Sequence, residues 1–191
     1  MKRTRAALIA ELTDITAQVI QDARPFQLID EQALNFKPGP KSWSVLECLE
    51  HLNRYGYFYL PEIEKRVSAA PESPEAEVFK SSWLGGKFAK SLEPYGEKVN
   101  KMRSPGNMNP NNSQLSPTVV DKFLKQQRHM QELLPLVKKV DLQKVKTSTS
   151  LSAFIKLRLG DTLMVVIYHN RRHVAQAQRV LQAWQQATAR A

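Results

Sequence analysis

Four long segments of the chain repeat apolar residues with the period of an amphipathic α-helix, and this pattern constrains the fold more than any other feature. The segments cover roughly residues 4–22, 44–67, 117–137 and 161–188. No stretch shows the convincing alternation of apolar and polar residues that is typical of a half-buried β-strand. We therefore expect an all-α fold in which the four long helices pack as a four-helix bundle.

The ends of these segments carry recognisable signals. Ser44 and Glu47 have the spacing of a capping box, in which each side chain accepts a hydrogen bond from the other residue's backbone N–H, so a helix should begin after Ser44. Pro61 interrupts the same helix and predicts a kink. Residues 151–159 resemble a short helix, and Asp161 is then expected as the N-cap of the last long helix.

The connection between the second and third long helices is long and irregular. It covers residues 69–116 and contains several prolines and the polar run 104–113. Short helices are expected at Trp83–Lys90 and Tyr95–Lys98. A connection of this length in a compact domain is usually either a functional cover or a mobile segment, and the sequence leaves both interpretations open.

Composition limits the class of protein. A chain of 191 residues with 42% apolar residues can bury one sizeable core, so we expect a single domain over residues 1–191. The one cysteine, Cys48, excludes an intrachain disulfide and a multi-cysteine zinc site, and we expect it to pack in the core. No apolar run approaches the roughly 18 residues of a membrane span, and the N-terminus does not resemble a signal peptide. We therefore expect a cytoplasmic protein without a membrane partner.

The chain is basic, with 28 lysines and arginines against 18 acids and a net charge of +10. Such a surface could attract nucleic acid, anionic lipid or a small anion. The charges are dispersed, however, and no helix-turn-helix, zinc finger or RNA-binding signature is present. We therefore expect no nucleic-acid partner.

Three of the four histidines form the most distinctive chemical feature. His169 and His173 are four residues apart in a helical segment, so both imidazoles lie on one face about one turn apart. His51 lies in the second long helix, at the edge of its apolar face. Imidazoles from facing helices can bind one divalent metal ion. From spacing alone, hydrogen-bonded core histidines explain the pattern equally well.

The residues between His169 and His173 exclude one class of metalloenzyme. A zincin peptidase needs a glutamate directly after the first histidine of its His-x-x-x-His motif. Asn170 occupies that position here. The chain therefore lacks the peptidase motif, and any metal chemistry has to be of another kind.

Other polar residues are weaker candidates for the metal site. Glu47 lies one turn before a histidine, but its capping role already accounts for it. Tyr55 and Glu62 could orient a histidine or bind a ligand. Arg172 could bind an anion, although arginines more often form surface ion pairs. His129 has no paired histidine and lies beside the buried stripe of its helix, so we expect it to face solvent.

Together these residues resemble the DinB-like superfamily of metal-dependent enzymes, which also includes YfiT-type proteins. The resemblance covers roughly residues 20–185. It rests on three motifs in this order: Trp43-Ser-Val-Leu-Glu-x-x-x-His51-Leu, Leu-Gly160-Asp161 and His169-Asn-x-Arg-His173-x-x-Gln176.

The resemblance implies both a fold and a site. Members of the superfamily are four-helix bundles in which three histidines bind a divalent metal, commonly nickel or zinc. It therefore implies that the metal ligands here are His51, His169 and His173. Characterised relatives include transferases and isomerases that use low-molecular-weight thiols such as bacillithiol or mycothiol. Relatives are often homodimers, so a homodimer is expected.

The leading hypothesis is a metal-dependent enzyme that acts on a small molecule as a low-molecular-weight-thiol S-transferase or a related hydrolase. Its cofactors would be Zn²⁺ or Ni²⁺ and the thiol. The alternative is a non-catalytic, stress-related metal-binding or interaction bundle. The alternative predicts a filled core around the histidines, whereas the enzyme predicts a cavity that connects them to solvent.

Overall fold

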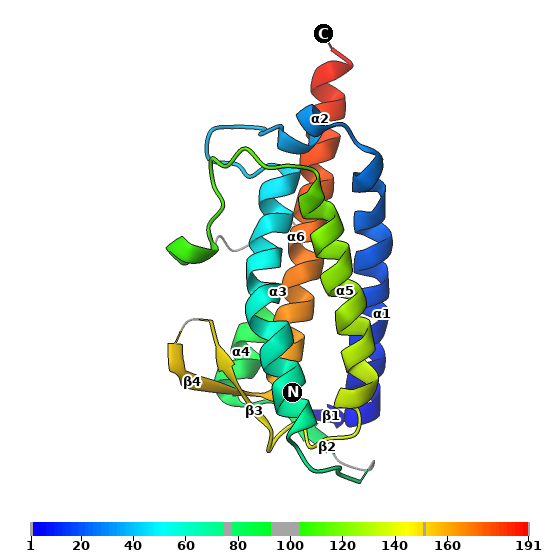
Figure 1. Cartoon of the computed structure of the whole chain (residues 1–191), viewed down its shortest axis with the longest axis vertical. Coiled ribbons are helices and arrows are strands. Elements are labelled where there is room, and N and C mark those ends of the chain that lie inside the picture. Colours follow the sequence, from blue (N-terminus) through cyan, green and yellow to red (C-terminus); the bar gives the residue numbers. More distant parts are fainter. Residues whose placement is uncertain (1, 75–77, 93–103, 151, 191) are drawn as a thin grey trace.

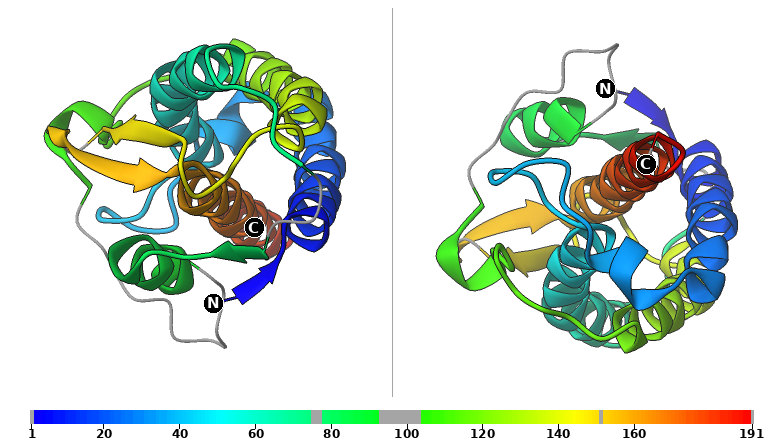
Figure 2. Two further views of the ribbon diagram at one scale, coloured as in Figure 1. Left: turned by 90° about the horizontal axis from the view of Figure 1, so that it is seen from below. Right: turned by 90° about the horizontal axis from the view of Figure 1, so that it is seen from above.

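The computed structural model of the chain is mostly helical, as the sequence predicts (Figure 1). The long helices are α1 (Arg5–Ala23), α3 (Val45–Ser68), α5 (Thr118–Val137) and α6 (Leu159–Thr188). They lie side by side around a common core, which is clearest in the views along the helix axes (Figure 2). Helix α3 contacts α5 and α6, and α1 contacts the same two helices. The structure describes residues 2–74, 78–92, 104–150 and 152–190.

Shorter elements connect the long helices. The helical ones are η1 (Arg24–Leu28), α2 (Glu31–Asn35), α4 (Trp83–Leu92) and η2 (Gly106–Met108). The strands form two antiparallel pairs, β1 (Lys2–Thr4) with β2 (Val78–Lys80) and β3 (Lys146–Thr149) with β4 (Ser152–Arg158). Both pairs lie at one end of the helices, and α2 lies at the other (Figure 1).

The strands depart from the expectation drawn from the sequence. Residues 151–159 were expected to form a short helix, and this prediction is wrong because they contain β4. Leu157 is buried, whereas Phe154 and Lys156 are exposed. A packed helix needs a wider apolar face than one buried residue provides. Pairing with β3 therefore outweighs the local helical preference.

The predicted start of α3 is confirmed. The backbone N–H of Glu47 donates to the Ser44 hydroxyl at 3.1 Å, and the backbone N–H of Ser44 donates to Glu47 Oε2 at 2.9 Å. This capping box satisfies two backbone donors at the end of the helix. From Ser44 the helix runs through Pro61 to Ser68.

The start of α6 differs from the prediction. The helix begins at Leu159, directly after β4, with Arg158 as its N-cap residue. Asp161 is instead fully buried in the first turn, and its Oδ2 accepts hydrogen bonds from the backbone N–H and the hydroxyl of Ser82 at 3.0 and 2.7 Å. Ser82 immediately precedes α4, where a carboxylate is favoured by the helix dipole. Asp161 therefore holds α4 against α6 and does not cap α6.

The long connection between α3 and α5 is only partly irregular. The short helix expected at Trp83–Lys90 is confirmed as α4. The helix expected at Tyr95–Lys98 lies outside the described residues. The polar run 104–113 contains η2, which contacts α3. This segment therefore lies beside the helix that carries His51.

Apolar side chains from the four long helices fill the core. Toward the end occupied by α2, Leu49 and Leu52 of α3 belong to the same buried cluster as Val174 and Ala177 of α6. Each of these four side chains is at most 1% exposed. Such close packing fixes how far α3 can slide or rotate against α6.

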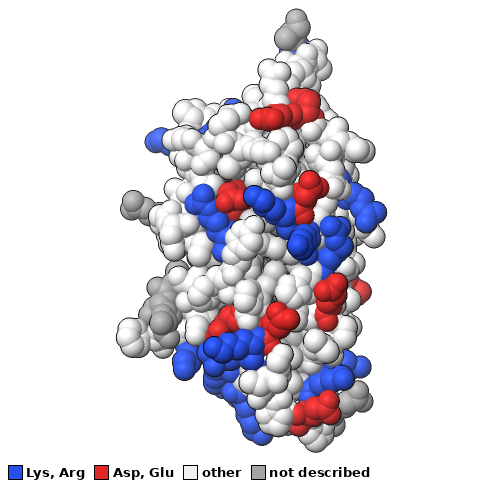
Figure 3. Space-filling model, viewed as in Figure 1, with Lys and Arg blue, Asp and Glu red and all other residues white. Residues whose placement is uncertain are grey.

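The surface mixes charges of both signs. Figure 3 shows lysine and arginine side chains interleaved with aspartate and glutamate on the face in view. None of the helices among the described residues is long and apolar enough to cross a lipid bilayer.

Replacing Gly85 by alanine should destabilise the contact between α4 and α6. A Cβ at this position would lie 2.4 Å from the carboxyl group of Asp161, which Ser82 holds in place. Alanine gains about 1 kcal/mol of helix propensity over glycine. Even so, we expect overpacking to lower the free energy of unfolding by ~1–3 kcal/mol in urea denaturation.

The matched control is Gly39→Ala, whose Cβ would meet Ser42 Oγ only at 3.7 Å. We expect that variant to unfold at the same urea concentration as the wild type. Equal stability of Gly85→Ala and the wild type would contradict the close packing of Asp161 against α4.

Candidate metal centre

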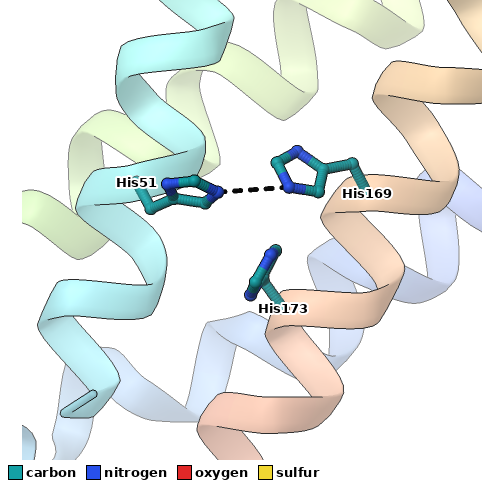
Figure 4. A group of neighbouring side chains, drawn as sticks. All are labelled: His51, His169 and His173. Atoms are coloured by element: carbon teal, nitrogen blue, oxygen red, sulfur yellow. Dashed lines mark hydrogen bonds between the residues drawn. The ribbon is translucent and has the colours of Figure 1, made fainter. Parts of the chain in front are cut away.

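Three histidines from two helices converge between α3 and α6 (Figure 4). His51 comes from α3, and His169 and His173 come from successive turns of α6. The ring centroids form a nearly equilateral triangle with sides of 4.9, 4.8 and 4.6 Å. One ligand atom from each ring lies within 4.8 Å of the others. The structure therefore brings together all three residues that the sequence selected.

A backbone carbonyl sets the tautomer of His51. Its Nδ1 lies 2.6 Å from the carbonyl oxygen of Met108, which can only accept, so Nδ1 carries the proton and donates it. Nε2 of the neutral ring then keeps its lone pair. In the absence of a metal this atom accepts a hydrogen bond from Nε2 of His169 at 3.2 Å (Figure 4). Two nitrogens that bind one tetrahedral Zn²⁺ at ~2.0–2.1 Å are about 3.3 Å apart, so the observed spacing suits a shared cation.

His173 is oriented in the same way by a side chain. Its Nδ1 lies 2.9 Å from Oε1 of Gln176, one turn further along α6, and donates to that oxygen. Its Nε2 is therefore the atom with a free lone pair. Metal-binding histidines usually donate their second ring N–H to such an acceptor. The donor set thus fits a divalent cation that prefers imidazole nitrogen.

Two aromatic side chains enclose the imidazoles. Trp43 precedes α3, and its ring centroid lies 4.7 Å from that of His51 and 5.6 Å from that of His173. The Tyr55 ring lies edge-on to His51 and His169 at 5.0 and 4.9 Å. These rings limit the rotation of the histidines and exclude water from part of the site. Because rigid walls hold the imidazoles, their convergence is largely pre-formed.

The three histidines differ in burial. His51 is buried, with 2% of its surface exposed, whereas His169 and His173 are partly exposed. The more exposed side of the group therefore lies at α6.

The surroundings keep all three imidazoles neutral. Burial lowers the pKa of His51 to about 4, and the positive charge of Arg54 acts in the same direction. Burial likewise lowers the pKa of His173 to about 3, and that of His169 falls well below its ordinary value. A histidine binds metal through its unprotonated nitrogen, so protons compete weakly with a cation at this site.

The two glutamates that the sequence raised as candidates lie outside the histidine group. Glu47 is buried in its capping box and also accepts from Lys37 Nζ at 3.3 Å, so its capping role is confirmed. Glu62 accepts from Arg66 at 2.9 Å and from the backbone N–H of Ser148 at 2.8 Å, which ties α3 to β3. Each carboxylate therefore has a structural role away from the imidazoles.

Of the remaining polar residues considered from the sequence, some contact the histidines and others do not. Tyr55 does contact the histidines, as described above. Arg172 lies on α6 and donates from Nη1 to the carbonyl oxygen of Ser91 at 3.1 Å. His129 lies 3.6 Å from the exposed Glu64 and is itself only partly exposed. Cys48 is buried, and burial raises the pKa of its thiol, which agrees with the predicted role in core packing.

Sequence reasoning missed the acceptors behind the ligands. The Met108 carbonyl is a main-chain atom of a connecting segment, and no side-chain pattern identifies such an acceptor. Gln176 follows His173 by three residues, so it lies one helical turn away, and this spacing is the only sequence signal for its contact with His173. Asn170, directly after His169, is also buried and donates to Gln127 Oε1 of α5 at 2.9 Å. This bond fixes the rotation of α6 beside the site.

Comparison with known proteins supports the resemblance to a family that the sequence motifs indicated. The family model described as the DinB superfamily matches residues 1–177. An uncharacterised protein of Bacillus subtilis (strain 168), YuaE, is 22% identical over 153 residues, which cover 80% of this chain and 85% of the relative. No solved structure gives a significant match to the chain.

The free energy of unfolding of the metal-free protein should rise with pH. In the unfolded chain each histidine gains its proton near pH 6.5, whereas in the folded protein His51 and His173 stay neutral to about 4 and about 3. Between pH 6.5 and these lower pKa values the unfolded state binds more protons than the folded state. The stability is therefore fully present above about pH 6.5 and is lost as the pH falls, by up to about 1.4 kcal/mol per pH unit and histidine.

Urea denaturation at several pH values measures this slope. The His173→Gln variant should show a shallower slope because one titrating group is gone. The matched variant His129→Gln, on the surface of α5, should keep the slope of the wild type. An unchanged slope in His173→Gln would show that the folded protein does not hold this imidazole neutral.

Proposed function

The chain belongs to the DinB superfamily, and we propose that it is a four-helix-bundle metalloenzyme that binds one divalent cation through His51, His169 and His173. The observation that carries this proposal is the convergence of three neutral imidazoles, two of which have Nδ1 engaged by a carbonyl oxygen. A packed core of hydrogen-bonded histidines would account for the hydrogen bond between His51 Nε2 and His169 Nε2 at 3.2 Å, but it does not require a third imidazole nitrogen within 4.8 Å of both.

The three imidazole ligands restrict which cations the site can bind. Three imidazoles suit first-row metals such as zinc and nickel better than magnesium or calcium, which prefer oxygen. We propose Zn²⁺ or Ni²⁺. Three protein ligands leave coordination positions open, as in catalytic sites, whereas structural zinc sites are closed by four. The partial exposure of His169 and His173 supports open positions that face solvent.

The reaction class that we propose is S-transfer with a low-molecular-weight thiol as cosubstrate, or a related hydrolysis in which water is the nucleophile. A bound divalent cation would lower the pKa of a thiol or of water, so that the nucleophile exists near neutral pH. In the transfer, the sulfur forms a bond to an electrophilic carbon of the small-molecule substrate. The bond to the leaving group breaks, and the thiol proton is released to solvent. The side chains of Trp43 and Tyr55 would exclude water from one side of the reacting atoms.

Protein purified without an affinity tag should contain close to one equivalent of divalent metal per chain. Replacing His169 by alanine removes one of three ligands, so we expect less than about a tenth of an equivalent to remain. Elemental analysis by inductively coupled plasma mass spectrometry measures both values. His129→Ala is the matched control and should keep the full amount. Equal metal content in wild type and His169→Ala would overturn the assignment.

Removing the acceptor behind His173 should weaken metal binding without removing a ligand. In Gln176→Leu the Nδ1–H of His173 loses its partner, and we expect about a 10- to 100-fold loss of affinity in competition with a chromophoric chelator. Gln176→Glu offers a stronger acceptor and should bind at least as tightly as the wild type. Gln178→Leu, two residues further along α6, should have no effect. An unchanged affinity in Gln176→Leu would show that Gln176 does not orient the ligand.

A further inference from the structure

An arginine of α3 contacts the segment whose carbonyl group orients His51. Arg54 follows His51 by three residues, so both side chains lie on the same face of α3. Nη1 of Arg54 donates to the carbonyl oxygens of Asn107 and Asn109, at 3.2 Å in each case. The carbonyl between them belongs to Met108 and accepts from His51 Nδ1 at 2.6 Å. Three consecutive carbonyl oxygens therefore accept hydrogen bonds from one turn of α3.

The guanidinium group of Arg54 is itself held in place. Its Nε donates to Oε1 of Glu50, one turn earlier on α3, at 3.1 Å. A guanidinium is planar, so a bond at Nε fixes the plane and with it the direction of Nη1. Nη1 carries two N–H groups and can donate one to each carbonyl oxygen. Arg54 can therefore fix the peptide groups on both sides of Met108 at the same time.

The next part of the same connection has a separate anchor. Nζ of Lys37 donates to the side-chain oxygens of Asn111 and Asn112, at 3.0 Å in each case. The backbone N–H of Ser113 donates to Oε1 of Glu47 at 3.3 Å. Replacing Arg54 would leave these bonds in place and would release only the residues around Met108. Its effect should therefore be local.

We propose that Arg54 is a positioning residue of the metal centre, which fixes the η2 segment so that the Met108 carbonyl holds His51 with Nε2 directed at the cation. This inference rests on the proposed function, because it takes the three histidines as metal ligands. The acceptor behind a metal-binding histidine fixes both its tautomer and its orientation. Arg54 acts one step further out, through the peptide groups that flank this acceptor.

The charge of Arg54 has an effect of the opposite sign. A guanidinium near the site repels a divalent cation, so by charge alone its removal would raise the affinity for metal. Loss of positioning lowers that affinity instead. The direction of the change therefore separates the two roles.

Competition with a chromophoric chelator measures the zinc affinity of Arg54→Gln. We expect roughly a tenfold loss relative to the wild type, as for other changes behind a metal-binding histidine. Arg54→Lys keeps the charge and can still donate to carbonyl oxygens, so it should recover part of the affinity. An unchanged or higher affinity in Arg54→Gln would overturn the positioning role.

The matched control is Arg66→Gln. Arg66 forms an ion pair of the same spacing on the same helix, with Nε 2.9 Å from Oε1 of Glu62. Its loss removes one charge and one ion pair from α3 but no contact with the η2 segment. We expect this variant to bind zinc as tightly as the wild type.

The tautomer of His51 in the metal-free protein provides a second readout. Nitrogen-15 NMR distinguishes a protonated imidazole nitrogen from an unprotonated one. In the wild type we expect well-separated signals from Nδ1–H and bare Nε2 of His51. In Arg54→Gln we expect these signals to move toward each other, because the Met108 carbonyl no longer selects one tautomer. Unchanged signals in the variant would contradict the inference.

The two measurements also separate this inference from the proposed function. Failure of the wild type to bind zinc would overturn the metal site, whereas a changed tautomer in Arg54→Gln would still show that Arg54 positions His51. Zinc binding by the wild type, together with an unaltered tautomer and affinity in Arg54→Gln, would overturn the inference and leave the metal site standing.

Discussion

The candidate centre depends on the packing of α3 against α6. One imidazole comes from α3 and two come from α6, and metal–ligand distances tolerate errors of only about 0.2 Å. The register between the helices is therefore decisive. Buried leucines of α3 and small apolar residues of α6 set it near the site. The bond from Asn170 to Gln127 sets the rotation of α6 directly beside His169. A change that loosens either contact would move His169 and His173 together relative to His51.

The same packing also controls the protonation of the ligands. An imidazole removed from water loses more in its charged form than in its neutral form, so burial favours the state that binds metal. The polar N–H that remains must still find an acceptor. The Met108 carbonyl and Gln176 provide these acceptors for His51 and His173. Each acceptor lies on the side of its ring away from the converging nitrogens, so satisfying the N–H also aims the lone pair at the site.

Much of this arrangement could be predicted from the sequence, because it depends on local periodicity. The long helices follow from their apolar stripes, and the start of α3 follows from the spacing of Ser44 and Glu47. The pairing of His169 with His173 follows from one helical turn. Convergence of that pair with His51 was indicated by the resemblance to a family, since spacing alone allowed ordinary core histidines.

The errors concern contacts between distant parts of the chain. Aspartate is a residue type that is favoured at N-caps. Asp161 Oδ2 instead accepts a hydrogen bond from the backbone N–H of Ser82, 79 residues away in sequence. Strand β4 forms because β3 is available to pair with it, which no property of residues 152–158 reveals by itself. The contact of His51 with the Met108 carbonyl is also invisible in the sequence, because any residue type could supply that oxygen. The sequence therefore located the three histidines but not the groups that orient them.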